Sequence, residues 1–256
     1  MTTPGTPDAT LSPRSPDTLP VTPKGASQFG HVFLIGGLGA GKTELALNLA
    51  INEAETSGPG KVDLVDLDIV NPYFRVRRVR EELEKRGINV VVPTARVQQG
   101  DLPALPAAIW GSLDSPERSV ICDVGGGELG LRPLGRLREI TARTSPRVFF
   151  LINPFRPGFQ SPKEIAAAFH HMEQLAALTT THIIANPHLM GETTPELFVR
   201  GYEMVVEFAR EIGLPVEFAM AAEEVVDSLR TKITGKLFAI RRFWRVPWVL
   251  GLEKEG

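Results

Sequence analysis

Short apolar runs alternate with longer helical patterns along most of this 256-residue chain. The apolar runs are rich in Val, Ile, Leu and Phe and lack a polar residue at every second position, which is typical of parallel strands covered on both faces. Strands are expected at residues 31–36, 61–66, 88–92, 119–123, 147–153, 182–186 and 215–220, and helices at 42–55, 73–86, 105–113, 131–143, 162–178 and 195–212. The alternation predicts a three-layer, doubly wound α/β fold: a mostly parallel sheet of about seven strands with helices on both faces.

The two ends of the chain differ from this pattern. Residues 1–28 hold six prolines among Thr, Ser, Asp and Gly, with no periodic apolar positions. Such a segment buries too little apolar surface to offset the entropy of ordering it, so we expect a disordered Pro/Thr/Ser-rich tail. Residues 29–256 are long enough for one sizeable core, and we expect a single domain with a C-terminal strand and tail from about residue 236.

Charge and cysteine content exclude several classes of protein. The formal net charge is −2, which argues against a general nucleic-acid-binding role, so no nucleic-acid partner is expected. The single cysteine, Cys122, allows neither an internal disulfide nor an all-cysteine metal site. No apolar run is long enough for a membrane span and no signal-peptide pattern is present, so a cytoplasmic location is expected.

A phosphate-binding loop is the strongest functional signal. The pattern G-x-x-x-x-G-K-[ST] is matched by Gly36, Gly37, Leu38, Gly39, Ala40, Gly41, Lys42 and Thr43. The match follows an expected strand and opens an expected helix, which is the context this motif requires. Backbone N–H groups of the loop and the helix N-terminus can cradle phosphates, Lys42 can reach the β- and γ-phosphates, and the Thr43 hydroxyl can ligate Mg²⁺. We therefore predict a P-loop that binds a nucleoside triphosphate with Mg²⁺.

Acidic residues lie at the carboxyl ends of two later strands of the pattern, 61–66 and 119–123. Asp66 and Asp68 lie at the carboxyl end of the strand at 61–66, at the sheet edge that also carries the P-loop. One of these carboxylates could orient an attacking water, and the other could serve the metal or its water shell. Asp123 ends another apolar strand before Gly125–Gly127, and could hold Mg²⁺ through water while a glycine N–H meets the γ-phosphate. Lys42, Asp66 and Asp68 are thus the predicted catalytic residues, and Thr43, Asp66 and Asp123 the predicted metal ligands.

In this order the motifs resemble the SIMIBI class of P-loop NTPases, and within it the MinD/ParA/CobQ nucleotide-binding group, over roughly residues 29–220. The resemblance implies that Asp68 is the water-positioning acid, Asp66 its companion, and Asp123 the Walker B acid. It also implies that Asn153-Pro154 closes the strand after the switch loop and that Asn186-Pro187 contacts the adenine.

The P-loop departs from that group at one position. The second residue of the MinD/ParA loop is a signature lysine that reaches the partner's nucleotide across a dimer, and here it is Gly37. The sandwich dimer is therefore not predicted, although a homodimer of another kind stays an alternative. Arg75 or Arg132 could supply transition-state charge instead, but a surface role is favoured for both.

ATP is favoured over GTP by the residues at the end of a late strand. Guanine-specific enzymes of related folds carry Asn-Lys-x-Asp or Thr-Lys-x-Asp there, whereas this chain has Asn186-Pro187-His188-Leu189. Another segment, residues 236–248, mixes basic and aromatic residues and could contact a membrane surface peripherally. We favour instead a final edge strand and a tail packed on the core.

Three classes of function agree with these motifs. The first is an ATPase that switches conformation to regulate or assist an unidentified protein partner. The second is an ATP-dependent ligase or kinase for a small molecule, of the cobyrinate synthase or dethiobiotin synthetase type. The third is a nucleotide-sensing scaffold with little hydrolysis. The lone Cys122, placed in a core strand, argues against a glutaminase domain and against metal-cluster assembly.

Overall fold

The computed structural model describes residues 30–68, 76–92 and 107–243. The expected tail at 1–28, Arg75 and the end of the basic-aromatic segment lie outside these residues. Eight strands form one sheet: β1 (His31–Gly36), β2 (Val62–Leu67), β3 (Ile88–Val91), β4 (Ser119–Val124), β5 (Arg147–Ile152), β6 (His182–Ala185), β7 (Val216–Ala222) and β8 (Leu237–Ile240). The strand order is β3-β2-β4-β1-β5-β6-β7-β8, and each neighbouring pair is parallel. The seven expected strands and the final edge strand are therefore all present.

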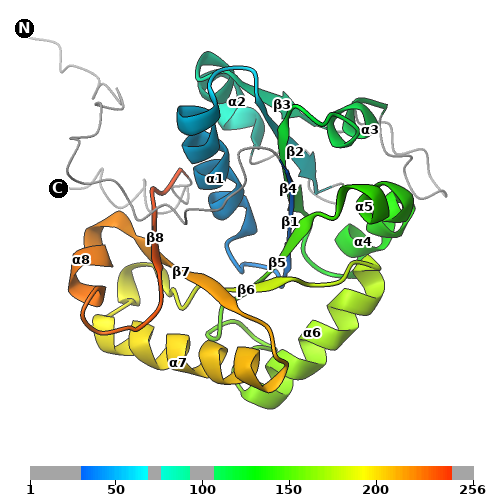
Figure 1. Ribbon diagram of the computed structural model, residues 1–256. Helices are drawn as coiled ribbons and strands as arrows, with labels where there is room; N and C mark the ends of the chain where they lie inside the picture. Colours follow the sequence, from blue (N-terminus) through cyan, green and yellow to red (C-terminus); the bar gives the residue numbers. More distant parts are fainter. Residues whose placement is uncertain (1–29, 69–75, 93–106, 244–256) are drawn as a thin grey trace, which may run out of the picture.

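Helices cover both faces of the sheet (Figure 1). The helices are α1 (Lys42–Ser57), α2 (Val76–Lys85), α3 (Ala107–Leu113), α4 (Glu128–Leu131), α5 (Arg138–Thr144), α6 (Pro162–Ala176), α7 (Pro195–Glu211) and α8 (Val226–Leu229). The described residues also form three short 3₁₀ helices, η2 (Arg132–Leu137), η3 (Met190–Glu192) and η4 (Glu223–Val225). This three-layer arrangement is the one that the sequence predicts.

Two cores lie on the two faces of the sheet, and the central strand β1 contributes to both. Phe33 and Ile35 belong to the core beneath α4 to α8, whereas Val32 and Leu34 belong to the core beneath α1. Alternate side chains of a strand point to opposite faces, so a strand covered on both sides is apolar throughout. This is why the apolar runs of the sequence are continuous.

One expected helix is wrong. Residues 131–143 form the end of α4, the 3₁₀ helix η2 and most of α5 instead of one α-helix. Pro133 lies at the start of η2; it lacks a backbone N–H and its ring clashes with the preceding turn of an α-helix. Gly135 weakens helix formation further in the same segment. The apolar periodicity is kept, since Leu131, Leu134 and Leu137 are all buried.

Candidate nucleotide-binding site

The P-loop connects the carboxyl end of β1 to the first turn of α1. Gly41 precedes α1 with φ 96°, a left-handed conformation that side chains other than glycine rarely adopt. A β-carbon at Gly41 would also lie 2.5 Å from Nδ2 of Asn186, which donates a hydrogen bond of 2.8 Å to the carbonyl of Ala40. Asn186 at the end of β6 thus holds the loop, and the loop backbone is open to a ligand above it.

Lys42 is buried at the base of this loop. Its Nζ donates hydrogen bonds of 2.9 Å to the carbonyl oxygens of Gly36 and Gly37. These bonds keep the ammonium group at the start of the loop, close to where the backbone N–H groups converge. A cation held in this position can pair with phosphate oxygens as a point charge.

The three predicted acids lie on neighbouring strands next to the P-loop. Asp66 of β2 and Asp123 of β4 are register partners, and both are buried. The backbone N–H of Asp68 donates a 2.9 Å hydrogen bond to Oδ1 of Asp66, which fixes the turn after β2. The structure therefore brings the acids together at the carboxyl edge of the sheet, where ligands bind in folds of this kind.

The glycine-rich loop after β4 packs against both of these groups. A β-carbon at Gly125 would lie 2.8 Å from Oδ1 of Asp68, and one at Gly126 would lie 3.3 Å from Nζ of Lys42. A larger residue at either position would require its neighbour to shift, and the separation is shortest at Gly125. The loop at Gly125–Gly127 is thus in contact with the P-loop lysine and with the carboxylate predicted to position water.

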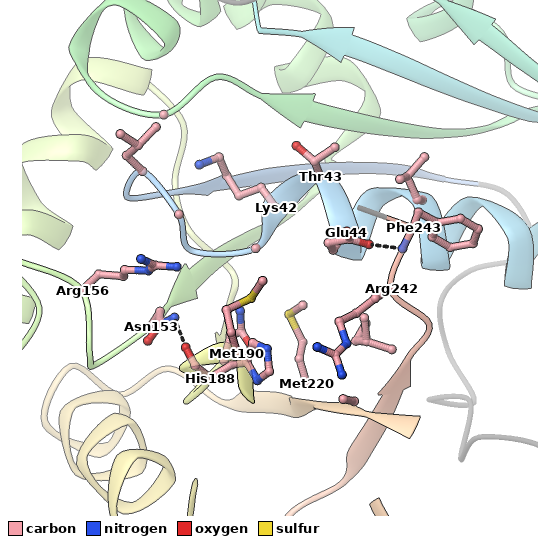
Figure 2. A pocket seen from close by; sticks show the side chains of 18 of the residues that line it. Lys42, Thr43, Glu44, Asn153, Arg156, His188, Met190, Met220, Arg242 and Phe243 are labelled. Atoms are coloured by element: carbon pink, nitrogen blue, oxygen red, sulfur yellow. Dashed lines mark hydrogen bonds between the residues drawn. The ribbon is translucent and has the colours of Figure 1, made fainter. Parts of the chain in front are cut away.

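A cavity of about 550 Å³ opens above the P-loop (Figure 2). At one end its walls include Gly39, Lys42, Asp68, Gly126 and Arg156, a set of polar groups and backbone. At the other end they are mostly apolar, with Leu47, Met220, Ala221, Ala222, Ile240 and Phe243. Ligand pockets typically measure roughly 300–1,000 Å³ and combine an apolar lining with a few polar groups. A polar end and an apolar end match the phosphates and the base of a nucleotide.

The sequence-predicted site residues divide into three sets. Seven of them line the cavity: Leu38, Gly39, Gly41, Lys42, Thr43, Asp68 and Asn186. Five others belong to the P-loop and to strands β1, β2 and β4 but do not line the cavity: Gly36, Gly37, Ala40, Asp66 and Asp123. Pro187 is buried away from it, because it packs against Gly201 of α7. Proline at 187 therefore shapes the packing of α7, while its neighbour Asn186 holds the P-loop.

Several lining residues were missed from the sequence, among them Arg156, His188, Met190, Arg242 and Phe243. Arg156 follows β5, a neighbour of β1, so its place after a strand end was a readable signal. The last two lie beyond β8, at the far edge of the sheet, and no local pattern indicates that this segment returns to the P-loop. Arg132, one of the two arginines considered for transition-state charge, does not line the cavity and pairs with Glu128 at 3.2 Å.

The segment after β8 is bound to the first turns of α1. The side chain of Asn48 donates to the carbonyl of Arg241 at 2.9 Å and accepts from its N–H at 3.0 Å. The N–H of Phe243 donates a 3.1 Å hydrogen bond to the carboxylate of Glu44 (Figure 2). These bonds place Arg242 and Phe243 in the cavity wall, so the described part of the basic-aromatic segment is a strand followed by a packed extension.

His188 lies between two positive charges in the cavity wall. Burial lowers the pKa of its imidazole, and the nearby Arg242 and Arg156 guanidinium groups lower it further, while Glu224 acts in the opposite direction. The imidazole is thus neutral near pH 7. Both guanidinium groups act on this imidazole, although Arg242 is itself paired with Glu224 at 3.2 Å.

The residues present fit a nucleotide with Mg²⁺. The glycines leave a cradle that β-carbons would fill, and Thr43, Asp66 and Asp123 supply the oxygen ligands that Mg²⁺ prefers. Within residues 30–68, 76–92 and 107–243, no three His, Cys, Asp or Glu side chains group closely enough to hold a metal unaided. Mg²⁺ usually binds through one or two carboxylates together with substrate phosphates, so such a group is not required.

Cys122 is a core residue. It is fully buried in β4, and burial raises the pKa of its thiol far above its usual range, with Asp123 and Asp63 adding to the effect. A thiol in this state is neither a nucleophile nor a metal ligand. The sequence-based interpretation of Cys122 as packing agrees with its place in the sheet.

Comparison with known proteins shows the class of fold. No family model matches the chain, and no curated protein matches it. Among solved structures it is similar to the cell division protein FtsY of Thermotoga maritima, with a TM-score of 0.52 and 18% identity over 76% of this chain and 62% of that one. It is likewise similar to chloroplast FtsY of Physcomitrella patens, with a TM-score of 0.52 and 16% identity over 75% of this chain and 58% of that one.

A third similar structure is the signal recognition particle receptor FtsY of Elizabethkingia anophelis, with a TM-score of 0.50 and 17% identity. The chain spans about three fifths of the length of these structures. At such identities the likeness concerns the fold alone, which is a P-loop NTPase-like α/β fold with a parallel sheet flanked by helices. In the part of the chain that the structure describes, no helix is long and apolar enough to cross a bilayer.

Proposed function

We infer that this chain is a Mg²⁺-dependent ATPase that uses hydrolysis to switch its affinity for a protein partner. The observation that carries the proposal is the contact of the Gly125–Gly127 loop with both Lys42 and Asp68. A loop placed against the phosphate-binding lysine and the water-positioning acid can sense whether the γ-phosphate is present. The resemblance to the MinD/ParA/CobQ group and a cytoplasmic location belong to the same proposal.

ATP is proposed as the nucleotide because of the apolar end of the cavity. Recognition of guanine generally uses a carboxylate that accepts from its N–H groups, and the carboxylates lining the cavity among the described residues are those of Glu44 and Asp68. Glu44 already accepts from the backbone of Phe243, and Asp68 lies at the phosphate end. Adenine requires no carboxylate, so Met220, Ile240 and Phe243 suit it better.

The chemistry proposed for the site is hydrolysis of the γ-phosphate. When bound, Mg²⁺ would supply positive charge that offsets the negative charge of the leaving group. Thr43 and the buried Asp66 and Asp123 are the residues that would hold it. Lys42 would contact the phosphates, and Asp68 would orient the attacking water.

A protein partner is favoured over a small acceptor by apolar side chains beside the switch loop. Leu38 in the P-loop is 73% exposed, and Leu129, two residues after Gly127, is 64% exposed. A β-carbon at Gly126 would lie 3.2 Å from the backbone of Leu38, so loop and leucine adjoin. Any movement of the loop would change this exposed apolar surface, which is a basis for nucleotide-dependent docking.

Asp68→Ala is expected to trap the partner-bound state. The substitution removes the water-positioning carboxylate but no phosphate contact, so ATP affinity should stay within about threefold while turnover falls by about 10²-fold or more. Bound nucleotide and phosphate release would be measured separately, by calorimetry and by a phosphate assay. Pull-downs with ATP and Mg²⁺ should then retain a partner on the variant more strongly than on the wild type.

Asp114→Ala is the matched control, because Asp114 is exposed and pairs with Arg143 away from the cavity. Its turnover should equal that of the wild type. If Asp68→Ala hydrolyses ATP at the wild-type rate, the role of Asp68 is wrong. If the wild type binds ATP but forms a phosphorylated or ligated small molecule, the partner-switch proposal gives way to the kinase or ligase class.

A further inference from the structure

The connection between β5 and α6 lies directly on the P-loop. Phe159 in this connection is buried, and a β-carbon at Gly37 would lie 2.5 Å from its Cε2 atom. Gly37 has no left-handed φ angle, so this ring, and not the backbone, is what excludes a side chain there. Gly37 is the position of the signature lysine in the MinD/ParA loop. Phe159 therefore occupies the space that such a lysine would need.

The same connection is held in a fixed shape. The side chain of Asn153 donates to the carbonyl of His188 at 2.9 Å and accepts from the N–H of Phe155 at 3.1 Å. Two turns follow, in which the N–H groups of Arg156 and Phe159 donate to the carbonyls of Asn153 and Arg156. Residues 153–159 are thus a turn that is constrained by hydrogen bonds within the protein.

Arg156 extends from this turn toward the P-loop (Figure 2). A β-carbon at Gly39 would lie 3.0 Å from its Nε and 3.2 Å from its Cζ, so the guanidinium group rests on the loop backbone. Its Nε is buried and has no hydrogen-bond partner among the described residues. Its side chain also lines the polar end of the cavity. A buried, unsatisfied guanidinium donor is costly unless a ligand completes it.

We propose that Arg156 contacts the phosphates of the bound nucleotide in cis, in place of the signature lysine that Phe159 excludes. The inference rests on the proposed function. A planar guanidinium group donates to two phosphate oxygens at once, and its place beside Gly39 and Lys42 puts it at the phosphate end. The inference therefore predicts that Lys42 and Arg156 of one chain both contact the phosphates, and that no residue of a second copy replaces the signature lysine.

The reaction that this arginine would assist is hydrolysis of the γ-phosphate of ATP. The water oxygen bonds to the γ-phosphorus while the bond from that phosphorus to the β–γ bridging oxygen breaks. The electron pair of the broken bond stays on ADP, and the water proton passes to the released phosphate. The negative charge that accumulates on the bridging oxygen is what a guanidinium group stabilises.

Arg156→Gln tests the contact by binding, independently of turnover. Calorimetry with Mg²⁺ and ATPγS should show an affinity lowered by about tenfold or more, since about tenfold corresponds to 1.4 kcal/mol, the lower range of a charge-assisted hydrogen bond. Arg156→Lys should recover part of this loss, because a lysine keeps the charge but not the two-pronged geometry. Without nucleotide, Arg156→Gln should melt no lower than the wild type, because the substitution removes a buried Nε donor that has no partner among the described residues.

Arg143→Gln is the matched control, since Arg143 is exposed and pairs with Asp114 away from the cavity. It should bind ATPγS with wild-type affinity. Equal affinities of Arg156→Gln and the wild type would overturn the inference and leave the proposed function intact. A wild type that does not bind ATPγS at all would instead overturn the proposed function and this inference with it.

Mixing two variants distinguishes whether Arg156 acts in the nucleotide site of its own chain or in that of a partner chain. Turnover per chain should be constant on dilution, and adding Lys42→Ala protein to Arg156→Gln should restore nothing, although the added chain carries an intact Arg156. Restored turnover in the mixture would place the arginine in a partner's site and refute the cis assignment. Binding of ATPγS by the same mixture gives a second readout that does not depend on hydrolysis.

Discussion

At the residue scale, we expect the ammonium group of Lys42 to have different partners without nucleotide and with it. Its ammonium group satisfies the carbonyls of Gly36 and Gly37 in the structure. In the nucleotide complex we expect the same group to pair with phosphate oxygens. The position of the charge is thus set by the loop before the ligand arrives, and the reorganisation on binding is small.

Lys42→Ala should abolish tight binding for this reason. Loss of a hydrogen-bonded charge costs roughly 1.5–3 kcal/mol, so ATPγS affinity should fall by about 10- to 150-fold. Isothermal calorimetry measures the change, and Lys61→Ala is the control, since Lys61 is an exposed partner of Glu117. An unchanged affinity of Lys42→Ala would remove the site assignment.

Residue identity alone predicted much of this site but not all of it. The P-loop, Asp68 and Asn186 lie in the cavity wall, and strand ends and glycine-rich turns were the local signals for them. Asn186 was expected at the adenine, but its side chain binds the carbonyl of Ala40 in the P-loop. Phe159 against Gly37 was not predictable, because the contact joins residues from two separate connections. The sequence showed that the signature lysine is absent, and only the packing explains why.

At the scale of elements, α1 is tied to the sheet by a buried carboxylate. Glu53 of α1 accepts hydrogen bonds from Oγ of Ser119 on β4 at 2.7 Å and from Oγ of Ser57 at 3.1 Å. Burial raises the pKa of Glu53, and the two hydroxyl donors only partly offset this effect. An ionised Glu53 therefore costs stability, although it joins the P-loop helix to the strand that carries Asp123.

Glu53→Gln should stabilise the fold as the pH rises. The native pKa lies above the ordinary value of 4.5, so above pH 4.5 the unfolded chain loses this proton before the native one does. The wild type therefore loses unfolding free energy as pH rises from 4.5 to the native pKa, whereas the amide does not titrate. Urea unfolding between pH 4.5 and 8 should show an advantage of the variant that grows and then levels off.

Glu55→Gln on the exposed side of α1 is the control, and its difference from the wild type should not grow in this way. A Glu53→Gln difference that is flat over the same pH range would contradict the assigned cause. The amide oxygen of the Glu53→Gln variant can still accept from Ser119. A large loss of unfolding free energy that is equal at every pH would therefore indicate a packing defect instead.

Helix and strand positions followed from periodicity where propensity and tertiary packing agree. Gly87 and Gly213 directly follow the expected helices at 73–86 and 195–212, and their φ angles of 77° and 69° are the left-handed values typical of helix ends. Propensity and packing conflict at Pro133 and Gly135. There the buried residues keep a helical spacing, but the segment cannot continue as one α-helix. The spacing of apolar residues indicates which side chains are buried. The backbone conformation of this segment depends instead on Pro133 and Gly135, which the apolar spacing does not take into account.

At the scale of the whole molecule, the cavity is closed by parts from opposite ends of the described chain. Asn48 on α1 binds Arg241, 193 residues later in the sequence. The two bonds satisfy both backbone groups of Arg241 and hold the segment that carries Arg242 and Phe243. Local patterns cannot predict a wall built in this way, which is why these two residues escaped the sequence analysis.

Asn48→Ala should weaken both the fold and the binding of nucleotide. Two backbone groups of Arg241 lose their partner, at roughly 1–3 kcal/mol for each buried group that finds no water. The melting temperature should fall, and ATPγS affinity should drop because Phe243 is no longer held in the wall. Asn52→Ala, one turn further along α1, is the control. An unchanged ATPγS affinity for Asn48→Ala would show that the 241–243 segment contributes nothing to binding.

The bond between Asn48 and Arg241 also has a consequence for the newborn protein. During translation the P-loop leaves the ribosome early, but the wall that closes its cavity emerges almost two hundred residues later. A nascent chain that ends before β8 therefore carries the full phosphate motif without a finished base site. We therefore expect that tight binding of the base requires β8 and the segment up to Phe243, although this segment follows the P-loop by almost two hundred residues.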